Sequence, residues 1–188
     1  MLAGTLWPMQ SLPHYWLEFR YPTMLPAGVL ALVLATLVCR RVARRLKTEP
    51  GVAWLLVAGL GGVLALTIAP SREALTVGVT GPVTCDFSRF GPASLSVYAQ
   101  MDDPFLNVMM FVPLGLAIGL LPPGRQKLVI AVAAALLPVA IETTQALIVG
   151  MGRACESGDV FDNVFGLLIG LAIGLAAITA LRRRDAID

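Results

Sequence analysis

A short polar stretch late in the chain contains residues that can carry out acid–base or ligand-binding chemistry. Glu142 and Gln145 lie three residues apart, and Arg153, Asp159 and Asn163 follow them in an otherwise apolar half of the sequence. Residues three or four apart share one face of a helix, so two pairs of polar groups would each point the same way. A carboxylate exchanges protons, and an arginine binds carboxylate or phosphate through a planar fork. Candidate acid–base residues are therefore Glu142 and Asp159, and candidate ligand-binding residues are Arg153, Gln145 and Asn163.

Each of these residues also has a purely structural interpretation. Glu142 and Gln145 could form a polar clamp between helices, a contact that contributes about 1 kcal/mol in membranes. Arg153 could pair with Glu142 or Asp159 instead of a ligand. Asp159 could be the N-cap of the last helix, because aspartate is favoured at that position. The residues alone leave both interpretations open.

The composition indicates an integral membrane protein. Of 188 residues, 57% are hydrophobic and only 14% are charged, whereas a soluble domain carries roughly 25% charged residues. The apolar residues fall in long runs that do not alternate with polar ones, which favours helices over the strands of a barrel. We expect one membrane domain over residues 1–188.

Five segments are long enough to cross a bilayer as helices of about 20 residues. They are residues 25–42, 52–69, 105–121, 127–149 and 160–181. The sequence therefore predicts an all-α membrane protein with about five transmembrane helices. Residues 70–104 form a long connection between the second and third of them.

The orientation follows from the distribution of lysine and arginine. Basic residues concentrate in the connections around 40–47 and 125–127 and at 182–184 near the C-terminus. The positive-inside rule then places the C-terminus in the cytoplasm and the N-terminus outside. Residues 70–104 become an extracytoplasmic loop, and the polar stretch faces the outer leaflet. We expect a multi-pass protein of a bacterial plasma (inner) membrane.

Residues 1–24 are interpreted as an interfacial or looped segment, with a disordered tail as the alternative. Two prolines, Pro8 and Pro13, interrupt any helix there. Four aromatic residues suit the headgroup level of a bilayer. They are Trp7, Tyr15, Trp16 and Tyr21.

Glycines predict close packing between two of the helices. Gly166, Gly170 and Gly174 recur at four-residue spacing in segment 160–181, and segment 105–121 has Gly115 and Gly119 at the same spacing. Small residues at this spacing let helix backbones approach closely. Such packing would bring Asn107, at the start of its helix, near Asn163, so Asn107 joins the candidate ligand-binding residues.

The predicted topology bears on the three cysteines. Cys85 and Cys155 both fall on the outer side, where an oxidising environment permits a disulfide, and Cys39 falls at the cytoplasmic end of its helix. A Cys85–Cys155 bond would tie the long loop to the polar stretch, and two unpaired thiols are the alternative. Three scattered cysteines and one histidine, His14, show no metal-ligand spacing. We expect no metal, no cofactor and no nucleic-acid partner.

Three blocks of residues resemble the VanZ-like family of bacterial membrane proteins. They are "NVMMFVPLG" at 107–115, "IETTQ" at 141–145 and "GRACESGDVFDNVFG" at 152–166. The resemblance extends over about residues 107–181. One departure is Gly158, because the family often has two adjacent acids where this chain has Gly158–Asp159. The resemblance implies a role at the cell envelope, since the family's namesake is associated with resistance to the glycopeptide teicoplanin.

Three functions are compatible with these features. The first is an outward-facing pocket that binds or modifies an amphiphilic envelope molecule, such as a lipid-linked precursor, a phospholipid or a lipoglycopeptide. The second is a non-catalytic membrane scaffold or modulator of another envelope protein, in which the polar residues only join helices. The third is a small transporter acting as an oligomer, which the absence of an evident inverted repeat disfavours.

Overall fold

Long apolar helices make up most of the chain, as predicted. The computed structural model describes residues 24–70, 74, 84–148, 150 and 154–185. Within these residues, five helices are long and apolar enough to cross a membrane: α2 (Met24–Leu46), α3 (Pro50–Ile68), α6 (Asp103–Leu120), α7 (Arg125–Leu147) and α8 (Ser157–Asp185). A short helix, α5 (Leu95–Tyr98), and two short strands, β1 (Cys85–Asp86) and β2 (Cys155–Glu156), complete the described elements. The predicted fold class is therefore confirmed.

The helix ends differ from the predicted segments for a simple reason. Hydropathy marks only the apolar part of a helix, whereas α2 continues through the basic residues to Leu46 and α8 continues to Asp185. Arginine and lysine are good helix formers and need not end a helix. At its other end α8 begins at Ser157, before the predicted start. The predicted interfacial segment, residues 1–24, lies outside the described residues except for Met24.

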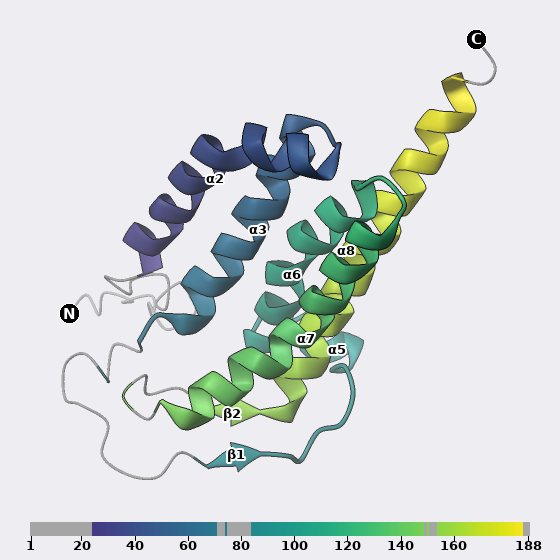
Figure 1. Cartoon of the computed structure of the whole chain (residues 1–188). Helices are drawn as coiled ribbons and strands as arrows, with labels where there is room; N and C mark the ends of the chain where they lie inside the picture. The colour runs from purple at the N-terminus through teal and green to yellow at the C-terminus, as the bar shows by residue number, and fades with distance from the viewer. Residues whose placement is uncertain (1–23, 71–73, 75–83, 149, 151–153, 186–188) are drawn as a thin grey trace, which may run out of the picture.

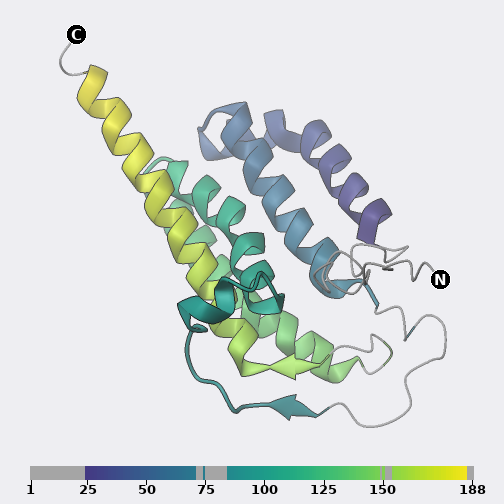
Figure 2. The same cartoon turned by 180° about the vertical axis from the view of Figure 1, so that it is seen from behind.

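The helices alternate in direction, and the molecule has two chemically different ends (Figure 1). At one end lie the α2–α3 and α6–α7 connections and the C-terminal end of α8; we call this the basic end. At the other end lie β1, β2, α5 and the start of α8; we call this the carboxylate end (Figure 2). This separation is the one that the lysine and arginine distribution predicts, with the basic end assigned to the cytoplasm.

Close packing of α6 on α8 is the tightest helix contact. A Cβ added at Gly166 or Gly170 would collide with the backbone oxygen of Val108 or Val112 on α6. On α6, a Cβ at Gly119 would lie 2.7 Å from the Cα of Gly174 on α8. Only residues without a side chain permit such an approach, so the predicted glycine packing is confirmed.

The apolar core lies between α3, α6, α7 and α8. Phe111 and Ile118 of α6 are fully buried, and they cluster with Val63 of α3 and Leu167 of α8. In contrast, α2 is the least buried of the five long helices, and its leucines, such as Leu37, are exposed. Figure 2 shows α2 and α3 as a hairpin at the side of the α6–α7–α8 group. In a membrane the outer face of α2 would contact lipid.

Candidate functional site

The predicted site residues gather at the carboxylate end of the bundle. Glu142 and Gln145 lie near the end of α7, Asp159 and Asn163 lie in the first turns of α8, and Asn107 lies near the start of α6. Because α6 and α8 start at the same end and α7 ends there, the three helices bring these side chains to one level. Arg153 lies outside the described residues, so its predicted role stays a prediction.

Glu142 is a buried carboxylate that joins α7 to the strand before α8. Its side chain is 7% exposed, and its Oε2 accepts a hydrogen bond of 2.8 Å from the backbone N–H of Glu156. A buried charge requires hydrogen-bond partners, and a bond from a backbone N–H to a carboxylate is among the strong ones. One role of Glu142 is therefore to hold β2 against the end of α7.

Gln145 joins α7 to the end of α3. Its Nε2 donates a hydrogen bond of 3.0 Å to the backbone oxygen of Thr67, and both side chains are buried. The Thr67 hydroxyl donates in turn to the oxygen of Val63, at 2.8 Å. This arrangement matches the structural interpretation of Gln145 as a clamp between helices.

Asp159 pairs with Asn107 across the α6–α8 contact. The carboxylate of Asp159 accepts a hydrogen bond from the Asn107 side chain, and three other acids, Glu156, Asp162 and Asp103, lie close enough to act on it electrostatically. The alternative interpretation of Asp159 as an N-cap is wrong, because α8 already begins at Ser157 and Asp159 lies inside its first turn. Negative charge in that turn still interacts favourably with the helix dipole.

Asn163 is the residue whose environment is incomplete. Its side chain is 1% exposed, and its Oδ1 has no hydrogen-bond partner within the part of the chain that the structure describes. A buried acceptor without a partner costs roughly 1–3 kcal/mol and calls for a physical explanation. Asn163 lies four residues after Asp159, on the same face of α8. An unsatisfied amide oxygen therefore lies next to the Asp159–Asn107 pair.

The sequence did not single out an ion pair that organises this end of the molecule. Asp162 of α8 is 0% exposed, and the guanidinium of Arg89 donates to both of its oxygens, at 2.6 and 3.1 Å. The Tyr98 hydroxyl donates at 2.6 Å and the backbone N–H of Ala93 donates at 3.1 Å. We call these four residues the Arg89 clasp. Four donors satisfy the carboxylate fully, which allows an aspartate to be buried inside the protein.

The clasp stays protonated at its donor groups over the physiological pH range. The hydrogen bond to Asp162 raises the pKa of Arg89. Burial, and next the hydrogen bond to Asp162, raises the pKa of Tyr98 to about 12. Arg89 and Tyr98 therefore remain hydrogen-bond donors to Asp162.

The backbone around Arg89 explains the glycine that departs from the family pattern. The Arg89 backbone oxygen accepts a hydrogen bond of 2.7 Å from the Ser157 hydroxyl, so the loop lies against the start of α8. A Cβ at Gly158 would lie 2.6 Å from Cζ and Nε of Arg89. In this chain the space beside residue 158 holds the Arg89 guanidinium, so an acid there would displace it.

Aromatic contacts cover the clasp. Phe90 meets Phe161 edge-on with ring centroids 6.4 Å apart, and Tyr98 stacks on Phe165 at 6.2 Å. Pairs of this kind contribute about 0.5–1.5 kcal/mol beyond the area that they bury. Together with the ion pair, they attach residues 89–98 of the long loop to α8.

The predicted disulfide is confirmed. Cys85 and Cys155 are bonded, with their Cα atoms 4.5 Å apart, and they face each other in the short parallel pairing of β1 with β2. The strand pairing was not predicted, because two residues per strand leave no periodicity in the sequence. The bond is adjacent to Glu156, whose N–H binds Glu142. The disulfide therefore holds the long loop, β2 and the end of α7 together.

A metal centre finds no support in the described part of the chain. No group of three or more histidine, cysteine, aspartate or glutamate side chains is placed there to hold an ion.

Comparison with known proteins identifies the family. A model of the VanZ/LLP1 family matches residues 57–178, more than half of the 188 residues. The match begins in α3 and includes the long loop, so it reaches further towards the N-terminus than the resemblance over 107–181 indicated. No curated protein and no solved structure matches the chain. The five membrane-spanning helices, the polar residues at their carboxylate end and this match together show that the chain belongs to the VanZ/LLP1 family.

Proposed function

We propose that the carboxylate end of the bundle binds the polar headgroup of an amphiphilic cell-envelope molecule. The candidates are a lipid-linked precursor, a phospholipid and a lipoglycopeptide. The observation that carries the proposal is the buried Oδ1 of Asn163, which lacks a described partner beside the Asp159–Asn107 pair. A ligand that donates a hydrogen bond to this oxygen would remove the cost of burying it.

The chemistry of the ligand follows from the acceptors that the site offers. Asp159 and Asn163 contribute carboxylate and amide oxygens, and Glu156 and Asp103 add negative charge nearby. Acceptors of this kind favour a headgroup rich in hydroxyl, amide or ammonium donors, as in sugars, peptides and amines. Arg153 would hold an anionic part of the same headgroup.

The proposal gives two residues roles that differ from those suggested by the sequence. Glu142 and Gln145 hydrogen-bond to backbone groups of β2 and α3, so in this proposal they position the site and do not touch the ligand. In this proposal the site binds its ligand, and Glu142 acts as a positioning residue. Placement of this end at the outer leaflet of the plasma membrane rests on the positive-inside rule.

A scaffold function is the second candidate, and a specific observation favours it. The described contacts of Gln145 and Asp162 join helices and loops within the molecule. A protein whose polar residues serve only its own fold would act by presenting a surface to another envelope protein. In that case the removal of Asp159 or Asn163 would change stability and leave lipid content unchanged.

Native mass spectrometry of the detergent-purified protein separates the two candidates. The comparison is wild type against Asp159→Asn, with Glu49→Gln as a matched control that removes one exposed acid from the other end of the molecule. The proposal expects the loss of one co-purifying envelope amphiphile in Asp159→Asn only. Equal lipid content in all three proteins would support the scaffold.

A cellular consequence follows if the ligand is a lipoglycopeptide or its target. Expression of the protein would then raise tolerance to teicoplanin, and Asp159→Asn would remove the effect at equal protein level. The measurement is the minimal inhibitory concentration in cells carrying wild type or variant, with membrane abundance checked by immunoblot. Unchanged tolerance would exclude a role in teicoplanin tolerance. The proposal that the site binds an envelope amphiphile would then be tested by native mass spectrometry alone.

A further inference from the structure

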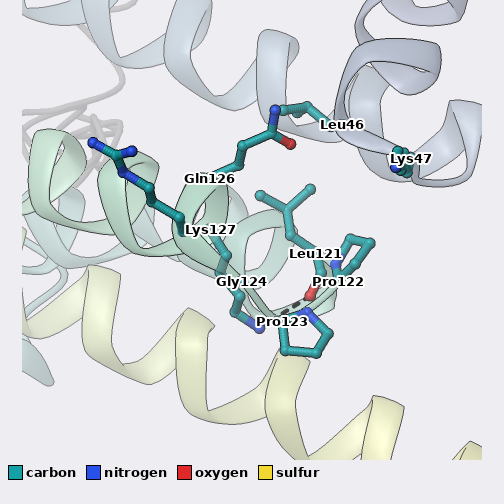
Figure 3. Close-up of a pocket in the computed structure, with 9 residues that line it drawn as sticks. Leu46, Lys47, Leu121, Pro122, Pro123, Gly124, Gln126 and Lys127 are labelled. Carbon is teal, nitrogen blue, oxygen red and sulfur yellow. Dashed lines mark hydrogen bonds between the residues drawn. The ribbon is translucent and has the colours of Figure 1, made fainter.

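The basic end of the molecule contains a cavity that is separate from the polar cluster described above. It has a volume of about 190 Å³ and lies between the end of α2 and the α6–α7 connection (Figure 3). Leu46 and Lys47 line one side, and residues 121–127 line the other. Figure 3 shows the Gln126 side chain reaching from α7 toward Leu46, so the cavity spans the gap between two helical hairpins.

The lining of the cavity is strongly basic. Lys47, Arg125 and Lys127 all border it, and the lining residues in the described part of the chain include no acid. Arg182 of α8 adds positive potential at Lys127. An anion bound in the cavity would interact favourably with the cations that line it.

The start of α7 favours an anion in the same place, and Lys127 lies beside it. Gly124 is the N-cap of α7 and makes no side-chain capping hydrogen bond, so the positive end of this long helix faces the cavity lining. Lys127 is held in position because its Nζ donates to the backbone oxygens of Gly119, at 2.7 Å, and Leu121, at 3.2 Å. An ammonium group has three donors, and no described residue takes the third.

Lys47 is also held in an unusual conformation. The residue has φ 51°, and the N–H of Thr48 bonds to the oxygen of Ala43 at 3.1 Å, which is the pattern that ends a helix with a left-handed residue. Glycine is the usual residue at this position, because a side chain strains the left-handed conformation. The lysine at this position also lines the cavity, so its positive charge lies beside it.

We propose that this cavity binds the phosphate of an anionic phospholipid headgroup from the leaflet on the basic side. Leu128, the residue after Lys127, is 64% exposed, and the leucines of α2 are exposed as well. Cations next to exposed leucines match a molecule with an anionic head and apolar chains. Basic pockets between membrane helices on the cytoplasmic side bind such headgroups. The lipid would join the α2–α3 hairpin to the α6–α7 hairpin.

The test uses the full-length protein in nanodiscs of phosphatidylcholine with and without phosphatidylglycerol. Thermal unfolding and native mass spectrometry report stability and retained lipid. We expect selective retention of phosphatidylglycerol and a higher Tm in its presence. Arg125→Gln should weaken retention about fivefold, whereas Arg41→Gln, which removes the same charge from an exposed position of α2 outside the cavity, should leave it nearly unchanged.

Lys47→Gly separates binding from folding. Glycine suits the left-handed position, so this variant should be at least as stable as wild type in phosphatidylcholine and still lose the phosphatidylglycerol effect. If Arg125→Gln and Arg41→Gln lost phosphatidylglycerol to the same extent, the attraction would be a general effect of positive charge, and the proposal would be overturned. Inorganic phosphate that reproduces the stabilisation without phosphatidylglycerol would overturn the assignment to lipid. Asp159→Asn should not alter this binding, so the two proposals can fail independently.

Discussion

The guanidinium of Arg89 binds the carboxylate of Asp162 through both oxygens, with the shorter contact at 2.6 Å. The two residues are 73 positions apart in the sequence, one in the long loop and one in α8. Asp162 is fully buried, and Arg89 keeps 33% of its side chain exposed. The pair fixes the loop over the start of α8, beside Asp159 and Asn163. The geometry of the candidate site therefore depends on a loop residue.

Breaking this pair from one side should destabilise the protein. Asp162→Asn leaves the guanidinium of Arg89 without its counter-charge, but Arg89 is one-third exposed to water, so the change costs about 1–3 kcal/mol. Thermal unfolding in detergent measures the change, and Glu49→Gln, an exposed acid at the basic end, should stay within about 0.5 kcal/mol of wild type. Similar Tm values for the two variants would show that the pair does not contribute to stability.

The pH dependence of stability should follow the two donors of the clasp. The pKa of Tyr98 is raised from 10.0 to about 12, and that of Arg89 is raised as well. A raised folded-state pKa contributes stability that is complete below the unfolded-state pKa and is lost as pH rises through the folded-state value. We expect constant stability from the clasp between about pH 6 and 9, followed by a decline above about pH 10.

Thermal unfolding as a function of pH tests this expectation. Tyr98→Phe removes the hydroxyl that titrates, so its Tm should be lower near neutral pH and should fall less steeply above about pH 10. An alkaline decline of the same size in wild type and Tyr98→Phe would contradict the role given to Tyr98.

A side chain at residue 158 should displace Arg89. Gly158→Ala places a Cβ against the guanidinium, and overpacking of this kind typically costs about 1–3 kcal/mol. Gly62→Ala is the matched control, because a Cβ at Gly62 of α3 meets nothing within 4 Å. Alanine should stabilise that helix by up to about 1 kcal/mol. We expect Gly158→Ala to lower the free energy of unfolding and Gly62→Ala to raise it. No change in stability for Gly158→Ala would contradict the described packing.

The disulfide should make stability sensitive to reduction. Cys85 and Cys155 are 70 positions apart, and a crosslink of this span stabilises by roughly 4 kcal/mol when loop closure dominates. Dithiothreitol should lower the Tm of wild type and of Cys39→Ser, since Cys39 is a free thiol. The double variant Cys85→Ser/Cys155→Ser should have a lower Tm that reductant does not change. If dithiothreitol also lowered the Tm of that double variant, the effect of reductant would not come from the Cys85–Cys155 bond.

The features that depend on local sequence could be predicted. Apolar length marks a membrane helix by itself, so all five long helices were identified. The glycine spacing in α6 and α8 predicted their contact, because small residues act through backbone distance alone. The Cys85–Cys155 bond followed from topology, since both cysteines fall on one side of the membrane.

The features that depend on distant partners could not be predicted. Glu142 and Gln145 bind backbone groups of Glu156 and Thr67, and a backbone N–H or oxygen has no sequence signature. Asp162 carried a usable signal, because an acid inside an apolar helix requires a partner. Nothing in the sequence indicates that this partner is Arg89. Hydropathy places the start of α8 too late, which makes an N-cap role for Asp159 look plausible from the sequence.

The most direct test of the central claim combines lipid content and stability in one variant, Asn163→Leu. Leucine has a similar size and removes the buried oxygen that has no described partner. If that oxygen serves a ligand, the variant should keep or exceed the wild-type Tm after delipidation and should lose the co-purifying amphiphile in native mass spectrometry. A large drop in Tm with unchanged lipid content would contradict the claim and make Asn163 a structural residue.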